Sequence, residues 1–368
     1  MSGPVERISS GQFFLLVMIS VVAGGVYLWP AYVLATAGLN AIYANAAITA
    51  TALGLTLLET HWALGIGRGP FTRTLQETWG RLGAWALLPV NCLLCLALDG
   101  ILLALYADML QTFFYPFTPR LAMAVVMVVT AVWIAVRPLS VVARNVQFWL
   151  PLILLSFALV VAMALGNTSY WTAFRPSLPF NLPKTGEAAL GTWFLYANGG
   201  VTASLVPFVR FRHTPRPGLV AGAAIVLQGA ILLLLLGIVV ATLGPMASST
   251  LTWPVIYVFS LITVRTFFLK GVGVFVLIIW TTAMVLFLTV HLFCLSWNVE
   301  ALAGGRRSIY TAAAGAVIAA VCVALSSVTE AEVVLFRWMN PLDLGWAVLT
   351  VPASFLAARV RERRRTAS

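Results

Sequence analysis

Long apolar stretches, separated by short polar segments, succeed one another along almost the whole chain. A membrane-spanning helix needs about 20 mostly apolar residues, since each residue adds about 1.5 Å along the helix axis. The pattern predicts ten such helices, at residues 12–36, 42–65, 82–112, 121–136, 146–165, 188–209, 219–243, 271–298, 309–325 and 342–358. A further apolar segment at 252–266 contains Pro254 and Arg265, so we expect a short helix lying over the outer face there.

The ten predicted spans fall into two groups of five within a single transmembrane domain, at about 8–166 and about 186–360. A group with an odd number of spans reverses the direction of the group that follows it. Glycine pairs stand at matching places in the first and sixth spans, because Gly199 follows Gly24 by 175 residues. Pro30 and Pro207 follow the two pairs, and both residue types weaken a helix. The sequence therefore predicts an all-α integral membrane protein, a 5+5 inverted repeat with discontinuous helices 1 and 6.

Broken helices in a membrane favour ligand binding, because an unwound backbone must find hydrogen-bond partners in a cavity or on a ligand. The N-terminus of a half-helix can hold a carboxylate, and free carbonyl groups can hold an ammonium. An amino acid carries both charges, so it is the ligand that we expect. Close packing through small residues would explain one glycine pair, but two pairs at matching positions favour a site. The candidate binding residues at the breaks are Ala23, Gly24, Gly25, Val26, Asn198, Gly199 and Gly200.

The composition supports this class and excludes others. Hydrophobic residues make up 61% of the chain and charged residues only 9%, which excludes an ordinary soluble domain, a disordered chain and a coiled coil. With a cytoplasmic N-terminus, 16 of the 22 basic residues fall on the inner side and 6 on the outer side, which indicates that both termini are cytoplasmic. The net charge of +11 is thereby explained without nucleic acid, and the basic tail at 359–368 is expected to meet membrane lipids.

A few polar side chains within the predicted spans are further candidates, because ionisable groups at bilayer depth are costly and often functional. Asp99 lies near the middle of the third span, where it could meet a ligand ammonium, carry a proton or be a buried paired acid. Tyr27 and Tyr196 flank the breaks and could close over a ligand. Thr281 and Thr282 could complete a sodium or substrate shell, although such threonines often bond their own helix.

Other polar residues are interpreted as packing or interface groups. Glu59 and His61 are expected to form an interfacial polar pair, and His291 a hydrogen-bonded packing contact. Metal binding is not predicted, because the three histidines of the chain are not at ligand spacing. No nucleotide-binding or catalytic-triad motif stands in a supporting context, so we expect neither an enzyme nor a cofactor.

Short motifs spread over almost the whole chain carry a family resemblance. They are Ile8-Ser9-Ser10-Gly11-Gln12, Thr118-Pro119, the segment from Arg144 to Pro151, Trp253-Pro254, Trp280 and the basic tail. The chain resembles the B subunits of spore-germination nutrient receptors, a spore permease family within the amino acid/polyamine/organocation superfamily. The resemblance implies a LeuT-like fold of ten spans, residence in a spore's inner membrane, and assembly with a larger A subunit and a C lipoprotein. Relatives often place an acid just after the sixth-span break, where this chain has Val201 and Thr202.

Two functions are compatible with these observations. The first is a germinant-binding receptor subunit, which holds an amino acid at the two breaks and passes a conformational bias to its partners. The second is an autonomous amino acid or amine transporter, coupled to protons or sodium and placed in the plasma membrane. The missing acid after Gly200 and the absence of lysine from the fifth span weaken ion coupling, whereas Asp99 supports it.

Overall fold

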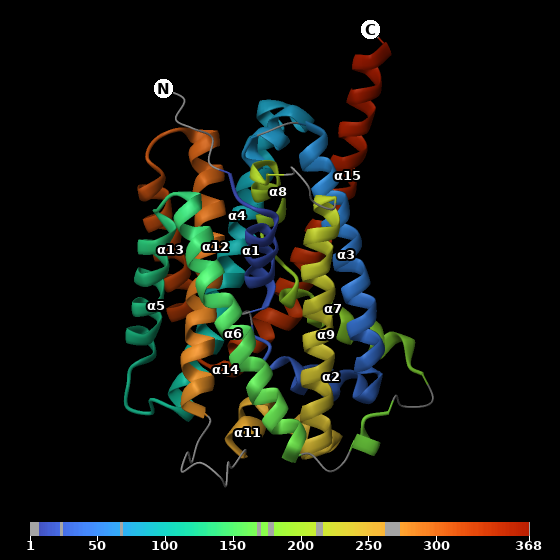
Figure 1. Cartoon of the computed structure of the whole chain (residues 1–368), viewed down its shortest axis with the longest axis vertical. Helices are drawn as coiled ribbons and strands as arrows, with labels where there is room; N and C mark the ends of the chain where they lie inside the picture. Colours follow the sequence, from blue (N-terminus) through green and yellow to red (C-terminus); the bar gives the residue numbers. More distant parts are fainter. Residues whose placement is uncertain are drawn as a thin grey trace.

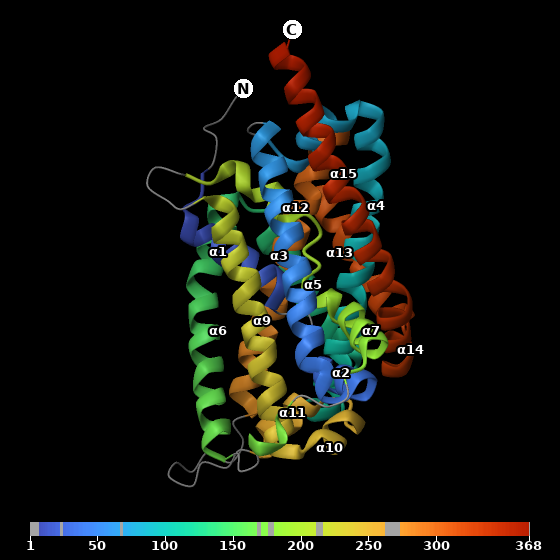
Figure 2. The same cartoon turned by 90° about the vertical axis from the view of Figure 1, so that its right-hand side faces the viewer.

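The computed structural model describes residues 7–22, 25–66, 69–167, 171–175, 180–210, 216–261 and 273–367. Helices that run mostly along one long axis form the bundle (Figures 1 and 2). Its longer helices are α1 (Ser10–Val22), α2 (Trp29–Ala37), α3 (Ala41–Ile66), α4 (Phe71–Phe113), α5 (Arg120–Ala135), α6 (Leu139–Asn167), α7 (Leu182–Thr192), α9 (Pro217–Leu243), α11 (Pro254–Leu261), α12 (Gly273–Ala303), α13 (Arg307–Ala324) and α15 (Asn340–Ala367). The shorter ones are α8 (Val201–Leu205), α10 (Pro245–Thr250), α14 (Val328–Val333) and the single turns η1 (Gly38–Asn40), η2 (Trp171–Ala173), η3 (Trp193–Leu195) and η4 (Val206–Phe208), with a π-helix, η5 (Val334–Met339).

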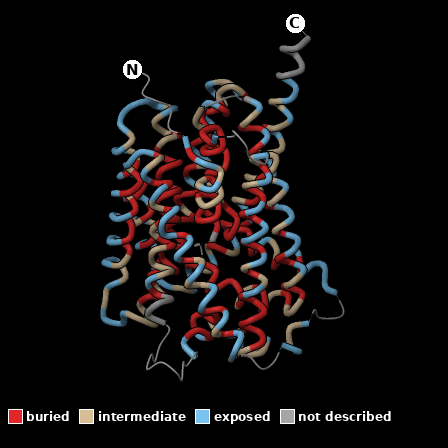
Figure 3. The backbone as a smooth tube through the Cα atoms, viewed as in Figure 1, coloured by how far each residue is buried: buried red, intermediate tan, exposed pale blue. Residues whose placement is uncertain are grey.

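The described part of the chain holds seven helices long and apolar enough to cross a membrane, and two shorter apolar helices, Ser10–Val21 and Arg120–Ala135. Buried residues gather along the inside of the bundle and exposed ones on its outside (Figure 3). Large apolar side chains such as Leu82, Phe117 and Leu349 lie on that outside, with 87%, 97% and 72% of their surface exposed. Such a surface suits lipid, so the chain is an integral membrane protein with several apolar spans.

The first helix is interrupted near the predicted place. α1 ends at Val22 and α2 begins at Trp29, while Ala23 and Gly24 lie outside the described residues. Gly25 has a φ of +95°, and a Cβ on it would lie 2.9 Å from the ring of Phe194 and 3.4 Å from Leu102. Only glycine fits both the backbone conformation and this close approach.

The sixth helix is interrupted as well. α7 ends at Thr192 and continues as the turn η3 to Leu195, and helical structure resumes with α8 at Val201. Between them Gly199 and Gly200 have φ values of +57° and +83°, and the side-chain oxygen of Asn198 accepts the N–H of Gly200 at 3.1 Å. The glycine pair and the preceding asparagine therefore fold as a tight turn within the bundle.

Two hydrogen-bonded contacts join the first interrupted helix to the sixth. Just before α1, the N–H of Ile8 donates to the carbonyl of Phe208 in η4 at 3.0 Å, and the N–H of Arg210 donates to the carbonyl of Ile8 at 2.9 Å. After the interruption, the indole N–H of Trp29 on α2 donates to Thr192 on α7 at 2.9 Å. The structure thus ties the residues before α1 to the end of η4, and α2 to α7.

Helix α4 runs through the middle of the bundle. Its 43 residues bend at Gly80, which has a φ of +77°, so the helix begins before the predicted third span at 82–112. From Leu98 to Ala107 every residue is buried. A helix that is buried on all sides belongs to the core, and this stretch of α4 contacts α12 and α13.

Candidate ligand-binding site

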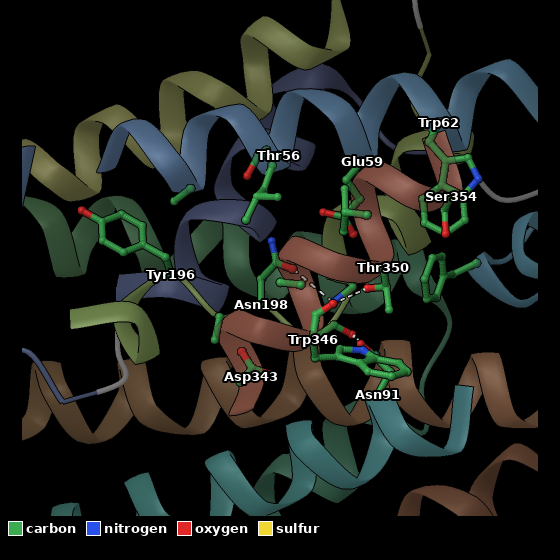
Figure 4. Close-up of a pocket in the computed structure, with 18 of the residues that line it drawn as sticks. Thr56, Glu59, Trp62, Asn91, Tyr196, Asn198, Asp343, Trp346, Thr350 and Ser354 are labelled. Carbon is green, nitrogen blue, oxygen red and sulfur yellow. Dashed lines mark hydrogen bonds between the residues drawn. The ribbon is translucent and has the colours of Figure 1, made fainter. Parts of the chain in front are cut away.

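A cavity lies beside the interruption of the sixth helix, between α3, α4 and α15 (Figure 4). Its polar lining comprises Thr56, Glu59, Asn91, Tyr196, Asn198, Asp343, Thr350 and Ser354, and its aromatic lining includes Trp62, Phe71, Trp193 and Trp346. Gly199 and Gly200 form part of the wall. The unwound backbone therefore borders a cavity, as an interruption inside a membrane requires.

Glu59 projects from α3 into this cavity (Figure 4), although only 7% of the residue is exposed. Its Oε1 accepts the backbone N–H of Ala203, in the first turn of α8, at 3.2 Å. The carboxylate thus contacts the helix that follows the interruption, and a ligand bound to Glu59 would also act on that helix.

Asp343 reaches the same cavity from the first turn of α15. Its Oδ2 accepts the indole N–H of Trp193 on η3 at 2.6 Å. Just before it, the side-chain amide of Asn340 donates to the carbonyl of Gly191 on α7 at 2.8 Å. These two bonds join the start of α15 to the part of the sixth helix that precedes the interruption. The π-helix η5 lies directly before Asn340, and such irregular turns are frequent at functional sites.

Helix α4 holds the interruption from its other side. The side-chain amide of Asn91 donates to the carbonyl of Gly199 at 2.9 Å. One turn farther along α4, Cys95 packs so closely that a Cβ on Gly199 would lie 2.6 Å from its Sγ. The close approach therefore requires glycine at position 199, independently of its φ.

Cys95 also belongs to a buried polar cluster, which it forms with Asp99 and His291. Asp99 Oδ1 and His291 Nδ1 form a hydrogen bond of 2.7 Å, and Cys95 Sγ lies 3.8 Å from Asp99 Oδ2 and 3.7 Å from His291 Nδ1. The three residues offer donor atoms within 4.8 Å of one another, a group that could hold a metal ion although the histidine spacing did not predict one. The direct Asp99–His291 bond uses the same atoms, so here the cluster is closed by its own hydrogen bonds.

A second cavity lies near the first interruption and is lined by Val26, Tyr27, Tyr106 and Trp280 among others. The ring of Tyr27 lies 5.8 Å from that of Tyr106 and 6.0 Å from that of Trp280. Apart from the hydroxyl groups of the tyrosines and the indole N–H of Trp280, the side chains of this lining are apolar. The others are Ile153, Leu154, Phe157, Ile231, Leu235 and Ala283. It offers space for an apolar group and few polar contacts.

The candidate residues from the sequence are consequently divided. Tyr196, Asn198, Gly199 and Gly200 line the first cavity, and Val26 and Tyr27 the second. Asp99 lies in the polar cluster, and Gly25 packs between Phe194 and Leu102. Thr281 bonds Tyr106 at 2.9 Å, whereas Thr282 bonds its own helix at the carbonyl of Ile278. The described residues of the two interruptions therefore do not share one cavity.

Sequence reasoning missed the two acids of the first cavity. The predicted interfacial pair of Glu59 and His61 is wrong, because Glu59 is buried and bonded to α8, while the ring of His61 bonds the carbonyl of Leu57. Asp343 is not among the residues predicted for the site. The available signal was the same for both, an acid within or beside an apolar run.

Interrupted helices, a cavity at one of them and an apolar exterior define a helical membrane protein, and the comparison with solved structures shows that its fold is of the LeuT type. The solved structure of MhsT in complex with L-phenylalanine is similar, with a TM-score of 0.67 and 14% sequence identity over 97% of each chain. A family model for spore germination proteins, the spore permeases, matches residues 7–331. The chain belongs to the spore germination protein family. A search of curated proteins finds no match.

Proposed function

We propose that this chain is the nutrient-binding subunit of a spore germination receptor and recognises an amino acid beside the interrupted sixth helix. The family assignment and the LeuT fold support this role. MhsT has that fold and was solved with an amino acid, L-phenylalanine, bound. The observation that carries the proposal is the cavity at Tyr196, Asn198, Gly199 and Gly200, where buried Glu59 also contacts α8.

The cavity suits a signalling role because its walls belong to different parts of the bundle. Glu59 belongs to α3, Asp343 to α15 and Gly200 to the interruption. A ligand that touches all three favours the arrangement in which they lie close together, by as much as its affinities for the two arrangements differ. In the receptor, the A subunit and the C lipoprotein would receive this bias at the spore inner membrane.

The second candidate is an autonomous amino acid or amine transporter coupled to protons or sodium. The buried Asp99–His291 pair favours it, because a hydrogen-bonded acid and imidazole inside a membrane can exchange a proton. A sensor binds its ligand without net flux, whereas a carrier accumulates it in closed vesicles. The two functions therefore make opposite predictions for the same purified protein.

The test is amino acid binding to the chain in lipid nanodiscs, followed by uptake into proteoliposomes. We expect saturable binding without uptake, and loss of binding in Gly200→Leu, because leucine is strained at a φ of +83°. Gly54→Leu is the matched control, since Gly54 lies on α3 with nothing within 4 Å of its Cβ position. Unchanged binding in Gly200→Leu would contradict the assigned site, and concentrative uptake would favour the transporter.

A further inference from the structure

We infer that the ligand of the first cavity is an organic cation, an ammonium or guanidinium group on an aliphatic chain. This inference rests on the proposed function and narrows its ligand class. It starts from the charges of the lining. Among the described residues that line the cavity, Glu59 and Asp343 are the two acids, and none is a lysine, arginine or histidine. This part of the lining therefore presents two carboxyl groups and no positive side chain to a ligand.

Neither acid is neutralised within the described part of the chain. The ion pairs there join Arg73 to Glu77, Arg120 to Asp108 and His291 to Asp99, and none includes Glu59 or Asp343. Each of the two receives a hydrogen bond from a neutral donor only, the N–H of Ala203 or the indole of Trp193. A neutral donor orients a carboxyl group but supplies no counter-charge, and a buried carboxylate without one is costly, so a bound cation would stabilise the charged form of both acids.

One oxygen of each acid remains available to a ligand. Glu59 uses Oε1 and Asp343 uses Oδ2, and no described residue bonds Glu59 Oε2 or Asp343 Oδ1. Figure 4 shows Glu59 on the α3 side and Asp343 on the α15 side, with Asn198 drawn between them. An ammonium carries three donors and a guanidinium five, so either can serve such acceptors.

The rest of the lining suits the body of such a ligand. Trp62, Phe71, Trp193, Tyr196 and Trp346 supply aromatic faces, which attract cations. Leu55, Leu75, Leu87 and Val351 complete an apolar wall against which methylene groups can pack. A cavity of acids and aromatic rings is the usual surrounding of a bound amine, and it serves a small neutral ligand less well.

An anionic group finds only neutral donors in the described part of this lining. One N–H of the Asn91 amide already bonds the carbonyl of Gly199, one of the Asn198 amide bonds Thr202, and the N–H of Gly200 is held by Asn198. The hydroxyl of Ser354 accepts the indole N–H of Trp79 and keeps its own hydrogen to donate. These donors can serve the single carboxylate of an amino acid, whereas a second carboxylate would lie beside two acids without a counter-charge.

The experiment compares ligands of equal length and different charge on the full chain in nanodiscs, by calorimetry. Lysine and norleucine differ in one ammonium group, cadaverine is lysine without its carboxylate, and agmatine is arginine without its own. We expect at least one of the four cationic ligands, lysine, cadaverine, arginine or agmatine, to bind at least tenfold more tightly than norleucine. Glutamate should not bind. The comparison within each pair decides whether the ligand is a basic amino acid or a simple amine.

Isosteric variants test the two acids. Glu59→Gln and Asp343→Asn should each weaken the cation at least tenfold and leave norleucine unchanged, whereas Glu77→Gln, outside the lining, should leave both unchanged. Equal binding of lysine and norleucine to the unmodified protein overturns the inference and leaves the proposed function intact. If no amino acid or amine binds, both fail. The charge preference of the unmodified protein decides the matter even if a variant does not fold.

Discussion

Gly199 lies where the sixth helix packs close against α4 beside the site. Its backbone needs a positive φ, its carbonyl accepts the amide of Asn91, and its missing side chain leaves room for Cys95. Each of these three requirements has its own physical cause, so different substitutions can measure their contributions to stability separately.

Gly199→Ala should destabilise the protein by about 2–4 kcal/mol, from a strained left-handed alanine and overpacking against Cys95. Adding Cys95→Ala should recover only the packing part, because the φ of +57° remains. Thermal unfolding in detergent measures both effects. Gly345→Ala on α15, where nothing lies within 4 Å of the added Cβ, should cost nothing. Equal stability of the single and double variants would contradict the packing argument.

Asp99 and His291 should behave as a coupled pair. Asp99→Leu leaves His291 without its 2.7 Å partner and should cost about 3–5 kcal/mol of stability, whereas Asp99→Asn preserves an acceptor and should cost less. The double variant Asp99→Leu/His291→Leu should be more stable than the sum of the single variants predicts. A double-mutant cycle on unfolding midpoints measures this coupling. Additive costs would show that the two side chains act independently.

At the scale of residues, the sequence located Asp99 but not its environment. An acid in a long apolar run is visible from the chain alone. Its partner His291 is 192 residues away, and Trp193 is 150 residues from Asp343. These pairs depend on how helices pack, so no local pattern contains them. Asp108 is likewise paired through helix packing, because Arg120 of α5 binds both of its oxygens at 2.9 and 3.0 Å.

At the scale of elements, the glycine pairs predicted where helices stop. A positive φ is a local property of glycine, so the sequence could mark Gly25 and Gly199–Gly200 without knowledge of the fold. The sequence could not show that the two interruptions face different cavities, because this depends on where each packs on α4: Gly199 bonds Asn91, and Gly25 lies against Leu102. A predicted single pocket thus became two cavities with a polar cluster between them.

The backbone contact of Ile8 should hold the end of the sixth helix in place. Ile8→Pro removes the N–H that donates to Phe208, so we expect faster hydrogen exchange at residues 208–210. Ile8→Val keeps the N–H and most of the buried side chain and serves as the control. Hydrogen-exchange mass spectrometry measures the difference. Identical exchange in the two variants would mean that the Ile8 contact does not hold this segment.

At the scale of the whole molecule, both chain ends should lie in the cytoplasm. The start of α1 and the end of α15 point toward the same end of the bundle (Figure 1), and 16 of the 22 basic residues fall on the predicted inner side. Fluorescent-protein tags at either terminus should therefore be active. Alkaline phosphatase fusions at these termini should be inactive, and fusions at residue 175 should be active. The reverse pattern would overturn the predicted orientation.

The pairing of Asp99 with His291 also bears on how the protein is made. The ribosome completes α4 long before His291 exists, and 192 residues at about 5–20 residues per second require roughly 10–40 s. During that time the nascent first half keeps an acid in the bilayer at a cost of about 2.5–3.5 kcal/mol. Until then, the insertion machinery or neighbouring helices must keep the Asp99 carboxyl group away from the lipid. A chain that terminates before α12 never gains this partner, and its acid stays unpaired in the bilayer.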